Sequence, residues 1–416
     1  RAGAGTTTGT ANTFIGGSSN SYAGYANTTG ANNTAVGTDA LAANTTAIEN
    51  TAVGYRALSA NTTGTVTNAF GADALRLNTT ANGNNAFGHS ALETNTTGAV
   101  NTAMGHRALT ANTTASNNTA YGAYALTANT TGASNTAVGS DALLANTTGE
   151  ENTAVGKQAL NSNTTGARHS AVGKGALGGN TTGTRSTAIG YVALGANTTG
   201  NYNTAVGDIA LINNTTGNLN TAVGIGALAA NTTGSDNTAM GSEALDSNTT
   251  ASNNTAVGRS ALGTSTTGSE NNAFGKGSLQ SATTGGDNSA FGVHTLHANT
   301  TGSANVAMGH YALDANTTAD NNVGIGSAAL GATTTGFSNV AVGKDAGDSN
   351  TTGSKNICIG QNANNSSVSG DHAIVIGHDI TSSANDFSFG KASNIVSNDF
   401  DADANWSRSS DERLKK

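Results

Sequence analysis

A repeat of 17 residues governs most of this chain. The glycine that ends the motif NTAVG returns at every seventeenth residue from Gly37 to Gly377, which makes twenty consecutive periods over 340 residues. Gly16 lies 21 residues before Gly37, so we expect the first coil to carry an insertion. A fixed period is the signature of stacked repeats, and 17 residues is neither the heptad nor the eleven-residue period of a coiled coil.

The positions of each repeat are counted from this glycine, which is position 0. Position −1 is always large and apolar, from Val36 to Ile376, and position +4 is leucine from Leu41 to Leu330. We interpret both positions as core. Position −2, as in Ala52, has the opposite parity along the strand and is therefore predicted to face outward, as a smooth surface for another chain.

Charged residues mark the turns of the coil. Between Gly37 and Gly377 every Asp, Glu, Lys and Arg occupies position +1, +2, +5, +11 or +12, as Lys157 and Glu151 illustrate. These positions follow the glycine at 0 and the Gly or Ala at +10, where turns are expected. The chain also has no proline, which suits a continuous ladder of backbone hydrogen bonds.

The pattern predicts an all-β fold, a parallel β-solenoid (β-roll) of about twenty coils stacked about 4.8 Å apart. A core of one Val and one Leu per coil is thin, at about 1.5–3 kcal/mol per large side chain, and this favours a homotrimer or another oligomer. Aspartate at Leu194 or Val206 is predicted to destabilise the fold severely, whereas Lys157 should tolerate replacement.

Four segments are expected along the chain. Residues 1–36 form one or more irregular N-terminal coils, and residues 37–380 form the solenoid shaft. The period is lost after Gly377, so residues 381–409 are predicted to be a C-terminal cap. Residues 410–416 form the fourth segment, which is interpreted below from its motif.

Composition excludes several classes of function. The net charge of −8 provides no basic footprint for nucleic acid. The chain also has no run of about twenty apolar residues, the length that is needed to span a membrane. Cys358 is the only cysteine and can form no internal disulfide. No cofactor motif is found, and the start at Arg1 without a signal segment suggests a fragment.

The recurring NTT triplet has three interpretations. It is formally a glycosylation sequon, as at Asn61, Asn112 and Asn231, but a ladder of Asn and Thr side chains capping one turn of each coil is favoured. Threonine rows also suggest an ice-binding solenoid. Against that, the Thr at position −3 gives way in later coils to apolar residues, which indicates a partly buried position; these are Val306, Val323, Val340, Ile357 and Ile374.

Neither a metal site nor a glycan-cleaving site is predicted. His89 and His106 share one phase in successive coils, but no carboxylate or cysteine recurs beside them, so exposed turn residues are favoured. The same holds for His294 and His310, which lie one phase apart in neighbouring coils.

Glycan cleavage would require two carboxylates roughly 5–10 Å apart in a groove. Glu150 and Glu151 are adjacent, but they fall at a turn where charges of both signs occur. The repeats therefore lend no support to catalysis on glycans.

The repeats resemble those of known adhesive fibres. The motifs NVAVG at 339–343 and NICIG at 356–360 resemble the NSVAIG-type repeats of trimeric autotransporter adhesin heads. That resemblance implies a left-handed parallel β-roll assembled as a homotrimer. The NTAVG/ALxxNTTG arrays are also similar to those of phage tail-fibre proteins.

The last seven residues, SDERLKK, resemble the S-D-x-R-L-K signature that opens the endosialidase-type intramolecular chaperone of phage fibres and spikes. The resemblance implies cleavage of the Ser409–Ser410 bond, with Ser410 as nucleophile and Lys415 as its general base. A lysine base must be desolvated, so this chain, without the chaperone body, is not expected to be an active enzyme. The alternative is an ordinary charged, solvated tail.

The expected function is a structural or receptor-binding shaft of a phage or phage-like tail fibre, matured by self-cleavage in a longer parent protein. It would be extracellular, on a virion tail fibre or a cell surface. Its partners would be two further copies of itself and a host-surface glycan or protein receptor. The alternatives are a trimeric cell-surface adhesin head and, more weakly, an ice-binding solenoid.

Overall fold

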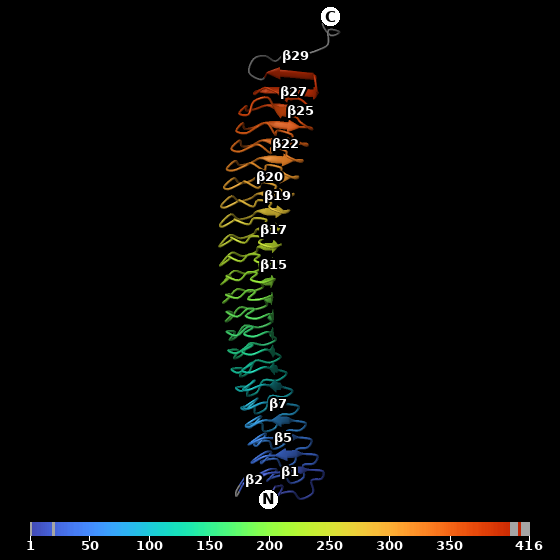
Figure 1. Ribbon diagram of the computed structural model, residues 1–416, viewed down its shortest axis with the longest axis vertical. Coiled ribbons are helices and arrows are strands. Elements are labelled where there is room, and N and C mark those ends of the chain that lie inside the picture. The colour runs from blue at the N-terminus through green and yellow to red at the C-terminus, as the bar shows by residue number, and fades with distance from the viewer. Residues whose placement is uncertain (1, 19–20, 400–406, 409–416) are drawn as a thin grey trace. The chain divides into compact units, whose positions relative to one another are not determined.

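The computed structural model describes residues 2–18, 21–399 and 407–408. The described residues contain no helix, and their regular structure is a succession of short β-strands, one to each coil from β4 to β22 (Figure 1). The chain divides into two compact units, residues 1–216 and residues 217–416. Both units are parallel β-solenoids, so the predicted fold class is confirmed.

The first unit contains the following strands: β1 (Thr13–Ile15), β2 (Gly17–Ser18), β3 (Ser21–Tyr22), β4 (Thr34–Val36), β5 (Thr51–Val53), β6 (Asn68–Phe70), β7 (Asn85–Phe87), β8 (Thr102–Met104), β9 (Thr119–Tyr121), β10 (Thr136–Val138), β11 (Thr153–Val155), β12 (Ser170–Val172), β13 (Thr187–Ile189) and β14 (Thr204–Val206).

Successive strands from β4 to β14 pair in parallel, each residue opposite its counterpart 17 residues later, as Thr136 lies opposite Thr153. The insertion predicted before Gly37 is confirmed. Strand β1 pairs with β4 at an offset of 21 residues, Thr13 opposite Thr34, and the antiparallel pair β2–β3 lies between them in the chain.

The second unit contains the following strands: β15 (Thr221–Val223), β16 (Thr238–Met240), β17 (Thr255–Val257), β18 (Asn272–Phe274), β19 (Ser289–Phe291), β20 (Val306–Met308), β21 (Val323–Ile325), β22 (Val340–Val342), β23 (Ile357–Ile359), β24 (Asn364–Asn365), β25 (Ile374–His378), β26 (Thr381–Ser382), β27 (Asp386–Lys391), β28 (Asn394–Asp399) and β29 (Ser407–Arg408).

Strands β15 to β23 and β25 keep the 17-residue register, and the pattern changes after β25. Strand β27 pairs in parallel with β25 at a shorter offset, Ile374 opposite Phe387. Strand β28 then runs antiparallel to β27, and β29 antiparallel to β28. Strands β27 to β29 therefore extend the same sheet and then reverse its direction, whereas β26 pairs in parallel with β24 in a separate two-stranded sheet.

The interior of each coil is lined by positions −4, −2, +3, +4, +7 and +10. Ala52, Leu58 and Asn61 represent positions −2, +4 and +7, and each is fully buried. The assignment of leucine at +4 to the core is confirmed, from Leu41 to Leu330. Every one of these leucines has a positive φ near +50°, a left-handed conformation that bulky side chains seldom adopt.

The prediction for the strand itself was wrong, because its two faces are exchanged. Position −1 points outward: Tyr121 is 55% exposed and Met240 is 45% exposed, and Val206 is half-buried rather than core. Position −2 points inward, and Ala52 does not face another chain. Aspartate at Val206 is therefore no longer expected to place a charge in the core.

The reason for this exchange is the narrow interior. Where β21 has Gly324 at position −2, an added Cβ atom would lie 3.0 Å from the Ala329 carbonyl oxygen and 3.2 Å from Leu313 Cγ. The strand thus packs directly on positions +3 and +4, and where leucine is present at +4 only alanine or a residue of similar size fits between them. Val375 of β25 is buried at position −2, but the two coils before it have Gly347 and Asn364 at +4. Large side chains must take the other face.

Asparagine ladders run through the interior and bond coil to coil. At position +7, Asn146 Nδ2 donates to Asn129 Oδ1 of the preceding coil at 2.8 Å and to the Gly149 carbonyl at 2.9 Å. At position −4, Asn135 Oδ1 accepts the backbone N–H of Asn152 at 3.0 Å. The predicted ladder is present, but it lies inside the coil and not at a turn, where it satisfies buried backbone groups.

Candidate interaction surfaces

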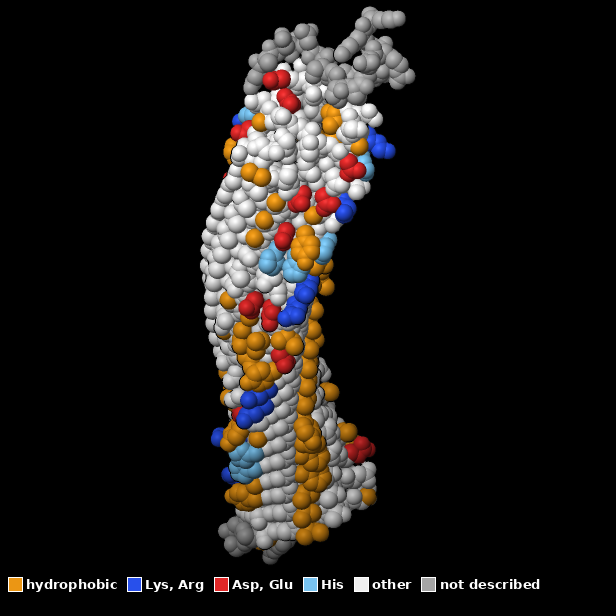
Figure 2. Space-filling model, turned by 45° about the horizontal axis from the view of Figure 1, so that its top comes forward, with side chains coloured by type: hydrophobic (Ala, Val, Ile, Leu, Met, Phe, Trp, Pro, Cys, Tyr) orange, Lys and Arg blue, Asp and Glu red, His pale blue; other side chains and the backbone are white. Residues whose placement is uncertain are grey.

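Each unit displays a row of large apolar side chains on the outer face of its sheet (Figure 2). We call this set of position −1 residues the apolar row. In the first unit it comprises Val36, Val53, Phe70, Phe87, Met104, Tyr121, Val138, Val155, Val172, Ile189 and Val206. In the second unit it comprises Val223, Met240, Val257, Phe274, Phe291, Met308, Ile325, Val342, Ile359 and Ile376.

The in-register pairing of the strands makes each row continuous within its unit. Equivalent residues lie opposite one another in the ladder, and the rings of Phe70 and Phe87 stack with centroids 4.8 Å apart. Phe274 and Phe291 stack in the same way at 4.9 Å. Strands spaced about 4.8 Å apart extend the first unit's row over roughly 50 Å. Monomeric soluble proteins rarely expose so long an apolar surface, and such surfaces mark sites of association.

Position −3 lies beside the apolar row on the same outer face. Most of its side chains are half-buried, among them Val323, Val340 and Ile357, as the sequence indicated, whereas Val306 is 38% exposed. From β20 onward both outer positions of the strand are apolar, so the surface widens towards the end of the second unit.

A histidine stack lies on the turn side of the first unit. The rings of His89 and His106 are 5.5 Å apart, and Tyr124 meets His106 edge-on at 5.2 Å. The shared phase of the two histidines thus brings their imidazoles together, and both side chains are exposed at the turn, as predicted. Among the residues that the structure describes, no three histidine, cysteine or acidic side chains converge so as to hold a metal ion.

A second cluster of rings lies at the equivalent turns of the second unit. The ring of His294 stacks on that of Tyr311 with centroids 5.7 Å apart and meets the ring of His297 edge-on at 5.0 Å. The ring of His310 is tilted against that of Tyr311, with centroids 4.0 Å apart. Partial burial, together with the positive charge of neighbouring His297, lowers the pKa of His294. Burial likewise raises the pKa of Asp314 beside the cluster.

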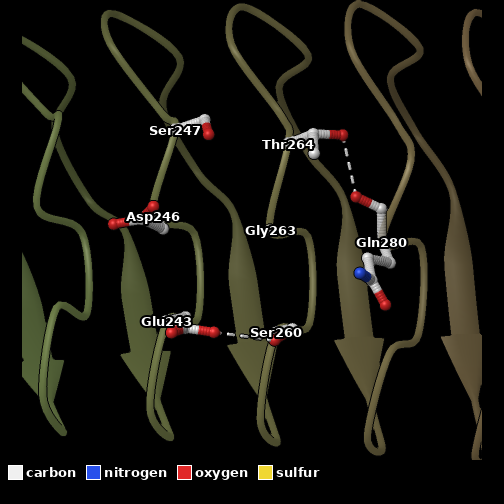
Figure 3. A pocket seen from close by; sticks show the side chains of 7 residues that line it. All are labelled: Glu243, Asp246, Ser247, Ser260, Gly263, Thr264 and Gln280. Atoms are coloured by element: carbon white, nitrogen blue, oxygen red, sulfur yellow. Dashed lines mark hydrogen bonds between the residues drawn. The ribbon is translucent and has the colours of Figure 1, made fainter.

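Beside this second cluster there is an open polar hollow of about 180 Å³ (Figure 3), lined by Glu243, Asp246, Ser247, Ser260, Gly263, Thr264 and Gln280. Gly263 occupies position +5, where its neighbours have side chains, so its missing side chain opens the space. Ser260 Oγ donates to Glu243 Oε2 at 3.3 Å, and Thr264 Oγ1 donates to the Gln280 carbonyl at 2.8 Å. Burial, and then the nearby Glu243, raise the pKa of Asp246.

The hollow is chemically ordinary. It has carboxylates, hydroxyls and an amide, but no aromatic ring among its seven lining residues. It therefore offers hydrogen bonds without the stacking platform on which sugar rings usually lie. Sequence reasoning missed it, and the only available signal was a glycine at position +5 between the polar residues Asp246 and Gln280.

The structure gives no support to glycosylation at the NTT triplets or to catalysis at Glu150 and Glu151. Asn61, Asn112 and Asn231 are fully buried, so they cannot carry a glycan in the folded coil. Glu150 and Glu151 are exposed, and Glu151 forms an ion pair of 2.8 Å with Arg168 of the next coil.

Cys358 is buried, and burial raises the pKa of its thiol to about 12. Its thiolate is therefore scarce at neutral pH, and the side chain behaves as a small core residue.

The predicted self-cleavage residues, Ser410 and Lys415, lie outside the described residues, as does the Ser409–Ser410 bond. The structure therefore neither brings them together nor separates them.

A search of the described residues for a helix long and apolar enough to cross a membrane finds none. No protein-family model matches this chain, and no curated protein matches it significantly.

Proposed function

We propose that this chain is the shaft of a phage or phage-like tail fibre, in which three copies associate through their apolar rows. The observation that carries the proposal is the exposure of the row along each unit, with Tyr121 and Met240 about half exposed. The coils are bonded to one another through their interior, so the side chains of the apolar row are not required to hold one coil to the next. Their burial requires another surface, and a symmetric self-association supplies it.

Two further features support a mechanical role. Each unit is held together by in-register backbone ladders and by asparagine ladders, which provide length and stiffness. The polar hollow lined by Glu243, Asp246 and Gln280 is open to solvent, which at that place supports scaffolding over catalysis.

The C-terminal signature supports a fibre over the alternatives. The resemblance of SDERLKK to the opening of an intramolecular chaperone favours an extracellular virion fibre, matured by cleavage before Ser410, over a trimeric cell-surface adhesin head. An ice-binding solenoid is the weakest alternative, because Phe70, Tyr121 and Met240 break the regularity of the outer face. A host-surface glycan or protein is the proposed receptor.

The association is tested by placing charges in the row. Tyr121→Asp combined with Met240→Asp should dissociate the trimer and raise its dissociation constant on the order of a hundredfold or more, because unpaired charges would be buried in the contact. Leu219→Asp combined with Ile225→Asp is the matched control, since both residues are exposed and apolar but lie outside the row. Sedimentation equilibrium at micromolar concentration gives the readout. A monomeric wild-type chain, or equal dissociation of the control, would refute the proposal.

The maturation step is tested separately on the longer parent protein. Its intact mass should show cleavage of the Ser409–Ser410 bond, and Ser410→Ala or Lys415→Ala should abolish the cut while the chains still associate. Cleavage that persists in Ser410→Ala would exclude the Ser–Lys mechanism and leave the shaft proposal to stand on its surface alone.

A further inference from the structure

One residue of the interior ladder differs in kind from all the others. At position −4 of the first unit the coils have asparagine almost throughout, but His169 occupies that place between Asn152 and Ser186. Its side chain is 1% exposed. A titratable ring thus stands where every equivalent side chain is neutral at all physiological pH values.

The ring reproduces the hydrogen bonds of the asparagine it replaces. Asn152 Nδ2 donates to the Gly166 carbonyl at 2.9 Å, and its Oδ1 accepts the next coil's backbone N–H. In the same way His169 Nε2 lies 2.6 Å from the Gly183 carbonyl oxygen, and the Ser186 N–H donates to its Nδ1 at 3.2 Å.

These partners fix the protonation state of the ring. A carbonyl oxygen can only accept, so Nε2 must have the proton, and a backbone N–H can only donate, so Nδ1 must be bare. Asn180 Nδ2 also lies 3.2 Å from Nε2, but it has its own acceptors in Asn163 Oδ1 and the Gly183 carbonyl. Only the neutral Nε2–H tautomer satisfies the site.

No charge is placed to compensate a second proton. The hydrogen-bond partners of the ring, from Asn180, Gly183 and Ser186, are all uncharged. The charged residues next to this ladder position in the sequence lie on the outside of the coils: Glu151 pairs with Arg168, and Arg185 bonds to Tyr202. Burial accordingly lowers the pKa of His169.

We propose that His169 makes the closed state of this coil sensitive to acid. When the ring takes up a second proton, the new Nδ1–H would point at the Ser186 N–H, and the coil between Asn152 and Ser186 would open. The sign follows from linkage. The open state binds a proton with the ordinary histidine pKa of about 6.5, and the closed state binds it less readily. The closed coil is therefore fully stable above that pH, and its stability falls as the pH falls below it.

Hydrogen exchange read by mass spectrometry tests this on the whole chain between pH 4.5 and 7.5. After correction for intrinsic exchange rates, the opening equilibrium of amides between 169 and 186 should rise by as much as tenfold per pH unit below about 6.5, until the folded-state pKa is reached. His169→Asn restores the common ladder residue and should remove that rise. His89→Asn, at an exposed turn, should leave it unchanged.

An independent readout is the ¹⁵N chemical shift of the His169 ring. It should report a neutral Nε2–H ring for as long as the coil is closed. An imidazolium inside a closed coil, or the same acid profile in wild type and His169→Asn, would overturn the proposal.

Discussion

The exchange of the two strand faces can be tested by placing the same side chain at two adjacent residues. Ala120 and Tyr121 are neighbours in β9, the first fully buried and the second 55% exposed. Ala120→Leu adds three carbons to an interior that is already closed, whereas Tyr121→Leu exchanges one apolar side chain for another on the outer face.

The magnitude follows from the space around position −2. Ala120 lies opposite Ala103 and Ala137 in the ladder, and at the equivalent Gly324 even a single Cβ would approach the Leu313 side chain within 3.2 Å. Three further carbons cannot be accommodated without moving the backbone, so Ala120→Leu should cost about 3 kcal/mol, the upper end for overpacking. Tyr121→Leu should cost less than about 1 kcal/mol.

Hydrogen exchange of β8, β9 and β10 is the appropriate assay, because a long repeat array need not unfold as one unit. Protection in β5, several coils away, serves as the internal reference. Equal losses of protection in the two variants, or a larger loss in Tyr121→Leu, would refute the assignment of alanine to the interior.

Two further predictions concern the interior of the coil. Leu194→Ala should cost about 2–5 kcal/mol of local stability because its side chain is fully buried, whereas exposed Lys157→Ala should change it by less than about 0.5 kcal/mol; equal exchange profiles would contradict this. Ser265→Asn should stabilise its coil by about 1 kcal/mol, because Ser265 interrupts the position +7 ladder and leaves Asn248 Oδ1 without a donor; a loss of protection there would show that the ladder geometry is wrong.

The period of the repeat predicted the fold. Which face of the strand is buried had to be inferred from the range of residue types at positions −1 and −2. Position −1 changes freely among Val, Phe, Met and Tyr, and position −2 is almost always alanine. Apolar character alone suggested that Val53 is core and Ala52 is surface. In so narrow a coil, a position that accepts only small side chains lies in the interior. A position that accepts apolar side chains of many sizes lies on the outer face.

Other features could not be predicted from residue types. Leu58 adopts a left-handed φ of 53°, a conformation that sequence patterns assign to glycine or asparagine. Asn61 reads as a polar turn residue, yet its amide is used inside the coil, bonded to Asn44 Oδ1 and to the Gly64 carbonyl. Both depend on contacts between successive coils, which no single repeat reveals.

The candidate surface was predicted in kind but placed on the wrong face. A thin core indicated that the shaft needs partners, and that expectation is now attached to Tyr121 and Met240 instead of to Ala52. The self-cleavage residues Ser410 and Lys415 stay a prediction, because they lie outside the described residues.

Single cysteines test most directly whether the apolar row joins the chains. Ile189→Cys places a thiol in the row, and Ile225→Cys places one on an exposed turn. The native Cys358 should not react with the cross-linker, because it is buried and burial raises the pKa of its thiol to about 12. With a short thiol cross-linker, Ile189→Cys should give covalently linked chains at micromolar concentration, and Ile225→Cys should stay uncoupled. Efficient coupling through Ile225→Cys with none through Ile189→Cys would contradict association through the apolar row.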